Sequence, residues 1–104
     1  MLKLTPNPNF EATVEIHVPG AGKIKVPFVF NYKDKDEYAA FTKEASDEKK
    51  AELEILLEIV KEWKNCDVPY STEALGMMLK KYHNAGTAIF AAYVSELTGA
   101  RLGN

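Results

Sequence analysis

The chain has 104 residues, enough for one modest hydrophobic core, and its 46% hydrophobic and 27% charged residues exclude a disordered chain. No apolar run approaches the roughly 18 to 20 residues that cross a bilayer, and a net charge of −2 lacks the basic excess that duplex nucleic acid requires. We therefore expect one domain over residues 1–104, with neither a membrane nor a nucleic-acid partner.

The first third of the chain predicts a β-hairpin. Residues 1–9 hold two prolines and little periodicity, which indicates an extended lead-in. Residues 10–32 alternate between apolar and polar, as half-buried strands do. The apolar positions are Phe10, Ala12, Val14, Ile16 and Val18, then Ile24, Val26, Phe28, Phe30 and Tyr32. The segment Pro19-Gly20-Ala21-Gly22 supplies the turn. Pro27 lacks an amide donor, so we expect it at an edge or a bulge.

Residues 34–99 are predicted to be helical. Asp34 with Glu37 three positions later fits a capping box that opens a short first helix. Ser46 is placed to cap a second helix running to about Trp63. The apolar residues of that second helix span roughly 200° of a helical wheel, whereas a surface helix needs about 100°. We therefore expect it to be covered from two sides.

Two more helices follow a turn. Ser71 is placed to cap the third helix, on which Met77 points outward, and Asn84 is placed to cap the fourth, which Gly99 ends. Residues 100–104 are expected to be a tail. One side of the fourth helix carries only small residues, namely Ala85, Ala88, Ala92 and Ser95. The predicted fold class is α+β: an N-terminal antiparallel β-hairpin packed against about four α-helices.

The sequence shows no catalytic constellation. His17, His83 and Cys66 lack the spacing of metal ligands, and Cys66 has no basic neighbour in sequence to favour a thiolate. The glycines of residues 20–22 precede a strand and lack the following Lys-Ser/Thr of a phosphate-binding loop. We therefore expect no enzyme, no metal and no cofactor.

A partner-binding surface is the more promising feature. The second predicted helix has more apolar width than one small core needs, and Met77 adds a flexible apolar side chain. The candidate partner-binding residues are Ile55, Ile59, Trp63 and Met77. For the second helix the alternative is plain packing between two layers of the same chain.

Cysteine usage and the N-terminal sequence predict a compartment. A single cysteine cannot form an internal disulfide, which agrees with a reducing environment. The first residues lack the apolar stretch and cleavage site of a signal peptide. We therefore expect a cytoplasmic protein.

In their order and spacing, several stretches resemble phage tail assembly chaperones of long-tailed phages and prophages. They are Leu4-Thr5-Pro6-Asn7-Pro8-Asn9-Phe10, Ala12-Thr13-Val14-Glu15-Ile16, Val18-Pro19-Gly20, Pro27-Phe28-Val29-Phe30, Trp63, Asp67-Val68-Pro69-Tyr70-Ser71, Glu73-Ala74-Leu75, Ala88-Ile89-Phe90, Tyr93 and Leu97-Thr98-Gly99-Ala100-Arg101. Cys66 and His83 depart from the family pattern, and both lie in predicted turns.

The resemblance implies a non-enzymatic role. Such proteins bind the long tape measure protein in the bacterial cytoplasm, keep it soluble, help bring tail tube subunits to it, and are absent from the mature virion. The family often makes a longer form by translational frameshifting. Two alternatives stay open, a structural tail or connector component and a small phage-encoded regulatory binding module. The oligomeric state is also open.

Overall fold

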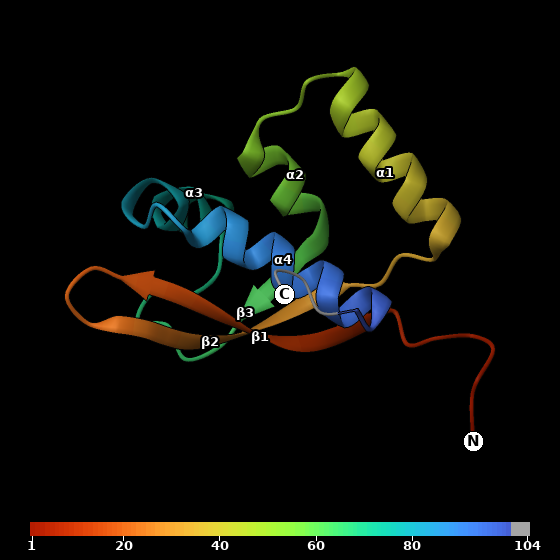
Figure 1. Cartoon of the computed structure of the whole chain (residues 1–104), viewed down its shortest axis with the longest axis horizontal. Helices are drawn as coiled ribbons and strands as arrows, with labels where there is room; N and C mark the ends of the chain where they lie inside the picture. Colours follow the sequence, from red (N-terminus) through yellow and green to blue (C-terminus); the bar gives the residue numbers. More distant parts are fainter. Residues whose placement is uncertain (101–104) are drawn as a thin grey trace.

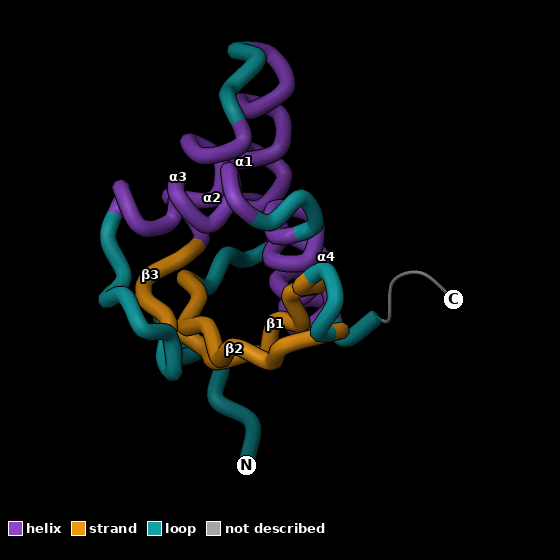
Figure 2. Tube along the Cα trace, turned by 90° about the vertical axis from the view of Figure 1, so that its left-hand side faces the viewer, coloured by secondary structure: helices purple, strands orange, loops and turns teal. Residues whose placement is uncertain are grey.

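A computed structural model describes residues 1–100 and shows a three-stranded antiparallel sheet with its helices on one face (Figures 1 and 2). The strands are β1 (Asn9–Val18), β2 (Gly22–Asn31) and β3 (Val60–Trp63), in the order β1-β2-β3. The helices are α1 (Lys35–Asp47), α2 (Glu52–Ile59), α3 (Thr72–Lys81) and α4 (Ala85–Thr98). The α+β fold predicted from the sequence is thus confirmed. The predicted tail lies mostly outside the described residues.

The predicted hairpin is confirmed. β1 and β2 pair along their whole length, from Asn9 opposite Asn31 to Val18 opposite Gly22. Ala21 donates its amide hydrogen to the Val18 carbonyl oxygen at 2.9 Å to close the turn. Of the alternating apolar residues, Val14, Ile16, Val26, Phe28 and Phe30 are buried as predicted, whereas Ile24 and Tyr32 are exposed.

The predicted second helix is wrong in its start and in its end. Ser46 lies in the last turn of α1 and caps nothing, whereas α2 begins after Ala51 without a side-chain cap. The helix stops at Ile59, and the next four residues form β3 against β2, with Trp63 opposite Phe28 and Val60 opposite Phe30. The free edge of β2 offers backbone hydrogen bonds that a continued helix would leave unused.

A bulge explains why the sequence pattern of β3 resembles a helix. Residues three apart in a regular strand point to opposite faces, yet Val60 and Trp63 are both buried. Val29 pairs with Glu62 and Phe30 with Val60, so Lys61 is the extra residue. The bulge turns both apolar side chains into the core at a spacing that also fits a helix face.

Pro27 lies where the pairing of β2 with β3 ends. The Lys64 amide donates to the Pro27 carbonyl oxygen at 2.9 Å, just past the last residue of β3. In an antiparallel sheet, the nitrogen and the carbonyl oxygen of one residue face the same neighbouring strand. The Pro27 nitrogen, which has no hydrogen to donate, therefore faces the end of β3. The ladder therefore loses no interior hydrogen bond there.

The predicted cap of α1 is confirmed, although the helix is longer than expected. The Glu37 amide donates to Asp34 Oδ1 at 2.8 Å, and the Asp34 amide donates to Glu37 Oε1 at 2.9 Å. These two bonds form the capping box. The only buried residue of α1 is Phe41, which limits the attachment of this helix to the body.

The predicted limits of α3 and α4 also hold. Ser71 Oγ accepts a hydrogen bond from the Ala74 amide at 3.0 Å, and Gly99 ends α4 with a φ of 75°. Asn84 occupies the N-cap position of α4 but makes no side-chain cap bond. The small side of α4 is not an exposed stripe, because Ala85 is buried and the other three small residues are half-buried, namely Ala88, Ala92 and Ser95.

α4 lies across the hairpin and is fixed there by Tyr93 (Figure 1). The Tyr93 ring centroid lies 5.2 Å from that of Phe30 and 5.7 Å from that of Phe10. Its hydroxyl donates to the Asn31 carbonyl oxygen at 2.9 Å. Burial of the phenol raises the pKa of Tyr93 above its ordinary value. The helix is thus held by ring packing and one inward hydrogen bond.

We expect Trp63→Ala to lower the free energy of unfolding by about 3–5 kcal/mol, because it leaves a cavity between the sheet and α3. Lys61→Ala, at the exposed bulge, is the matched control and should change stability by no more than about 0.5 kcal/mol. Urea denaturation followed by circular dichroism measures both. Equal effects of the two substitutions would contradict the burial of Trp63 in the core.

We expect Tyr93→Phe to cost about 1 kcal/mol at neutral pH, because the Asn31 carbonyl loses its donor. The native state keeps the phenolic proton that the unfolded chain releases above about pH 10, so stability should fall as the pH rises past that value. Tyr93→Phe should make this loss of stability at high pH smaller. Tyr32→Phe, at a partly exposed ring, is the control, and an unchanged alkaline slope in Tyr93→Phe would refute the explanation.

Candidate functional site

An apolar groove of about 760 Å³ lies between α1, α2 and α4. We call it the helix groove. Twelve residues line it: Phe41, Thr42, Ala45, Ser46, Lys50, Glu52, Ile55, Leu56, Gly86, Thr87, Phe90 and Ala91. Its volume lies within the range of about 300–1,000 Å³ in which proteins bind small ligands or a few side chains.

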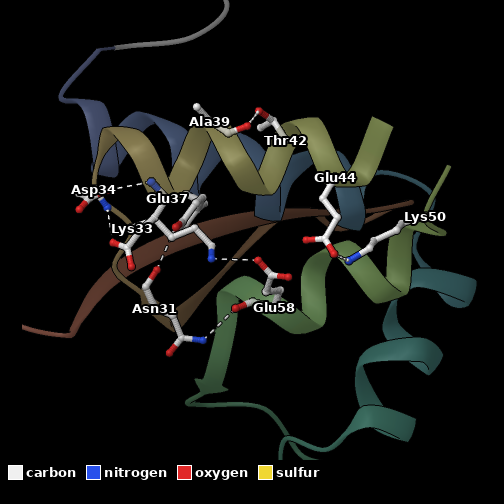
Figure 3. A network of polar contacts seen from close by, with 10 residues as sticks. Asn31, Lys33, Asp34, Glu37, Ala39, Thr42, Glu44, Lys50 and Glu58 are labelled. Carbon is white, nitrogen blue, oxygen red and sulfur yellow. Dashed lines mark hydrogen bonds and ion pairs between the residues drawn. The ribbon is translucent and has the colours of Figure 1, made fainter. Parts of the chain in front are cut away.

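The groove exists because α1 is held by only a few contacts. Lys33 Nζ lies 5.0 Å from the centroid of the Phe41 ring and 2.9 Å from Glu58 Oε2 on α2, so one lysine joins α1 to α2. At the other end of α1, Lys50 Nζ lies 3.5 Å from Glu44 Oε1 (Figure 3). Between these polar contacts, the backbone of α1 packs only sparsely against any other helix or strand of residues 1–100. The apolar side chains between the helices are therefore left partly open.

The lining is apolar and only partly covered. Phe41 and Leu56 are buried and form its base, while Ala45, Ile55 and Phe90 are half-buried. Half-buried aromatic and aliphatic side chains in a concave site can still gain burial from a partner. The groove can therefore bind an apolar side chain from another molecule.

Gly86 lets α2 approach the start of α4. A Cβ atom at this position would overlap the Glu52 carboxylate. This places an acidic group beside the first turn of α4, whose N-cap Asn84 forms no side-chain cap bond. A negative charge is favourable next to the electropositive start of a helix.

The groove is acidic at its α1–α2 end. Partial desolvation lowers the pKa of Lys50, but Glu44, Glu48 and Glu54 together raise it above the ordinary lysine value. Glu52 lines the groove and forms none of the ion pairs found within residues 1–100. One lysine thus lies among several carboxylates, and this end favours a cationic partner.

A smaller cleft of about 210 Å³ lies between β3 and α3. We call it the methionine cleft. Met77 is 46% exposed at its edge, and Trp63 lies at its base with Nε1 donating to the Val68 carbonyl oxygen at 2.8 Å. The residues that line it are Trp63, Cys66, Asp67, Val68, Ala74, Met77, Met78, Lys81 and Tyr82.

The four candidate residues from the sequence do not form one surface. Ile55 lines the helix groove, while Trp63 and Met77 line the methionine cleft. Ile59 is fully buried in the core. As Trp63 is on a strand, the helical wheel that grouped it with Ile55 and Ile59 does not apply to it.

Sequence reasoning missed the contributions of α1 and α4 to the groove. Phe41 is the one large apolar residue in the middle of an otherwise polar helix, which is a signal that α1 attaches at a single point. Phe90 belongs to the predicted fourth helix, and the sequence gives no sign that it lies beside α2. Its position beside Ile55 depends on how α2 and α4 pack, which no local pattern specifies.

The residues considered for chemistry are dispersed. His17 and His83 are exposed, and Cys66 Sγ lies 3.8 Å from Asp67 Oδ1. Within residues 1–100, no three side chains of His, Cys, Asp or Glu are grouped so that they could hold a metal ion. None of the helices in this part of the chain is long and apolar enough to span a membrane.

A family model described as phage tail assembly chaperone matches residues 1–104. Comparisons with curated proteins and with solved structures give no match. The family match covers every stretch on which the resemblance was based, including the hairpin and the ends of α3 and α4. The chain therefore belongs to the phage tail assembly chaperone family.

Proposed function

We propose that this tail assembly chaperone binds the tape measure protein, keeps it soluble, and helps to recruit tail tube subunits during tail assembly. It would act in the cytoplasm of the host bacterium and leave before the virion is complete. Membership of the family points to this non-enzymatic role. The observation that carries the proposal is the apolar helix groove, which fits a partner bound through side-chain burial.

The groove suits an amphipathic helix of the client. Helical partners insert apolar side chains spaced at i, i+3 or i+4 into grooves between helices. Phe41, Ile55 and Phe90 offer such side chains an apolar lining. Long apolar helical stripes aggregate when unassembled, so covering part of one keeps the client in solution.

The methionine cleft is a second proposed contact. Methionine adapts its shape to varied apolar partners, and Met77 presents nearly half of its surface. Trp63 contributes to the base of this cleft and Ile55 to the helix groove. Ile59 is fully buried in the core, so in this proposal it does not touch the client.

We expect Ala45→Glu to reduce the tape measure protein that co-purifies with the chaperone by about tenfold or more. A carboxylate forced into an apolar contact costs more than the roughly 1.4 kcal/mol that corresponds to a tenfold change. The measurement is co-expression with the tape measure protein encoded nearby, followed by quantification of its soluble and co-purified fractions.

The matched control is Ala40→Glu, the same substitution on the exposed side of the same helix. It should leave binding unchanged. Equal loss in both variants would remove the helix groove from the proposal. Precipitation of the tape measure protein with the unaltered chain, together with recovery of this chain from purified virions, would favour a structural tail component instead.

We expect Met77→Glu to impair client binding and Ile59→Glu to impair folding. Met77→Glu should leave the free energy of unfolding within about 0.5 kcal/mol and weaken client binding. Ile59→Glu should cost about 4 kcal/mol or more, because it buries a carboxylate in the core. Urea denaturation and co-purification measure the two effects. Lys80→Glu on α3 is the control, and unaltered binding by Met77→Glu would exclude the methionine cleft.

A further inference from the structure

The N-terminal arm, residues 1–8, presents apolar side chains that its own chain leaves uncovered. Met1 and Leu2 are fully or almost fully exposed, and Leu4 is 94% exposed. The arm leaves the body beside the start of β1 and runs away from it (Figure 1). Three large and almost fully exposed apolar side chains within four residues indicate a contact with another molecule.

The arm is fixed at its base and restricted by two prolines. The Tyr32 amide donates to the Pro8 carbonyl oxygen at 2.9 Å, which fixes the base of the arm to the end of β2. Pro6 and Pro8 restrict the backbone and bias the residues before them toward extended conformations. Such a segment loses little conformational entropy when it docks, and proline-containing extended segments bind in grooves lined by aromatic rings.

The helix groove matches the arm in polarity and in charge. Phe41 and Phe90 supply aromatic rings to an apolar lining that several side chains could fill. Lys3 stands between Leu2 and Leu4, and the groove carries Glu52 at its acidic end. An arm with leucines in the groove would bring its one lysine toward carboxylates, which is the favourable arrangement.

The groove that an arm fills belongs to another molecule. All helices lie on one side of the sheet, and the arm extends beyond the opposite side (Figure 2). The base of the arm lies near Tyr93, through Phe10, whereas the groove is built on the first half of α4, from Gly86 to Ala91. The arm therefore points away from the groove of its own chain.

We propose that the N-terminal arm of one copy docks in the helix groove of a second copy and covers it until a client displaces the arm. Reciprocal docking of two copies gives a closed dimer, and one-way docking gives a ring or a chain of copies. This docking of the arm requires only the groove and the arm. It therefore goes beyond the proposed function and is tested without any client.

Sedimentation velocity over a range of protein concentrations tests the self-association. The unaltered chain should form a dimer or a larger assembly, and the double substitution Leu2→Ser with Leu4→Ser should raise its dissociation constant by about tenfold or more. Ile24→Ser, which removes another exposed apolar side chain on β2, is the control and should change nothing. An unaltered chain that stays monomeric at every concentration, or a double variant that associates equally well, overturns the proposal.

Disulfide trapping tests where the arm lies. Two differently tagged chains, both carrying Cys66→Ser, are mixed, one with Leu4→Cys and the other with Ala45→Cys. A disulfide between the two tags is expected, and Ala40→Cys on the outer side of α1 should give at least tenfold less. Equal trapping at both positions overturns the proposal, as does a disulfide within one chain that carries Leu4→Cys and Ala45→Cys together.

Co-purification of the tape measure protein separates this proposal from the proposed function. The arm variant should bind the client at least as well as the unaltered chain, because its groove is open. If the arm variant loses the client and still self-associates, the arm is a client contact and the proposal is overturned. If neither the unaltered chain nor any variant binds the client, but self-association still depends on the arm, the proposed function fails and the docking of the arm stands.

Discussion

A continuous row of six aromatic rings holds the sheet and its helices together. Successive centroids lie 5.0 to 5.8 Å apart. The row runs from β1 through α4, across β2 to β3, and ends beside the start of α3. Its members are Phe10, Tyr93, Phe30, Phe28, Trp63 and Tyr70. Rings at these spacings add specific pair energies to their burial, so the row fixes the order of the elements as well as their contact.

The same row leaves α1 outside the core. The apolar face of the hairpin is covered by α4 and α2, so α1 has little left to cover, and Phe41 is its one buried residue. Lys33 then joins α1 to α2 through one ring contact and one ion pair. A helix attached at so few points leaves a groove beside it, and this is the physical origin of the proposed client site.

Local chemistry was predictable wherever a few adjacent residues determine the structure. The alternation of the hairpin, the Asp34–Glu37 capping box and the glycine at the end of α4 each act within one element, and each is confirmed. β3 could not be found in this way, because the bulge at Lys61 gives its two buried residues a helical spacing. The site was harder still, since Ile55 and Ile59 are alike in sequence and only the packing of α4 leaves one of them open.

A chaperone groove must satisfy two opposing conditions. It needs enough uncovered apolar surface to gain burial from a client, yet that surface must not join copies of the chaperone irreversibly. The acidic surroundings of Lys50 oppose close approach of like surfaces while admitting a basic segment. An arm with two leucines around one lysine meets both conditions, since it covers the groove through few side chains and so binds weakly enough to be displaced. If the proposed client site is correct, the half-buried lining of the groove balances affinity for the client against irreversible association with other copies.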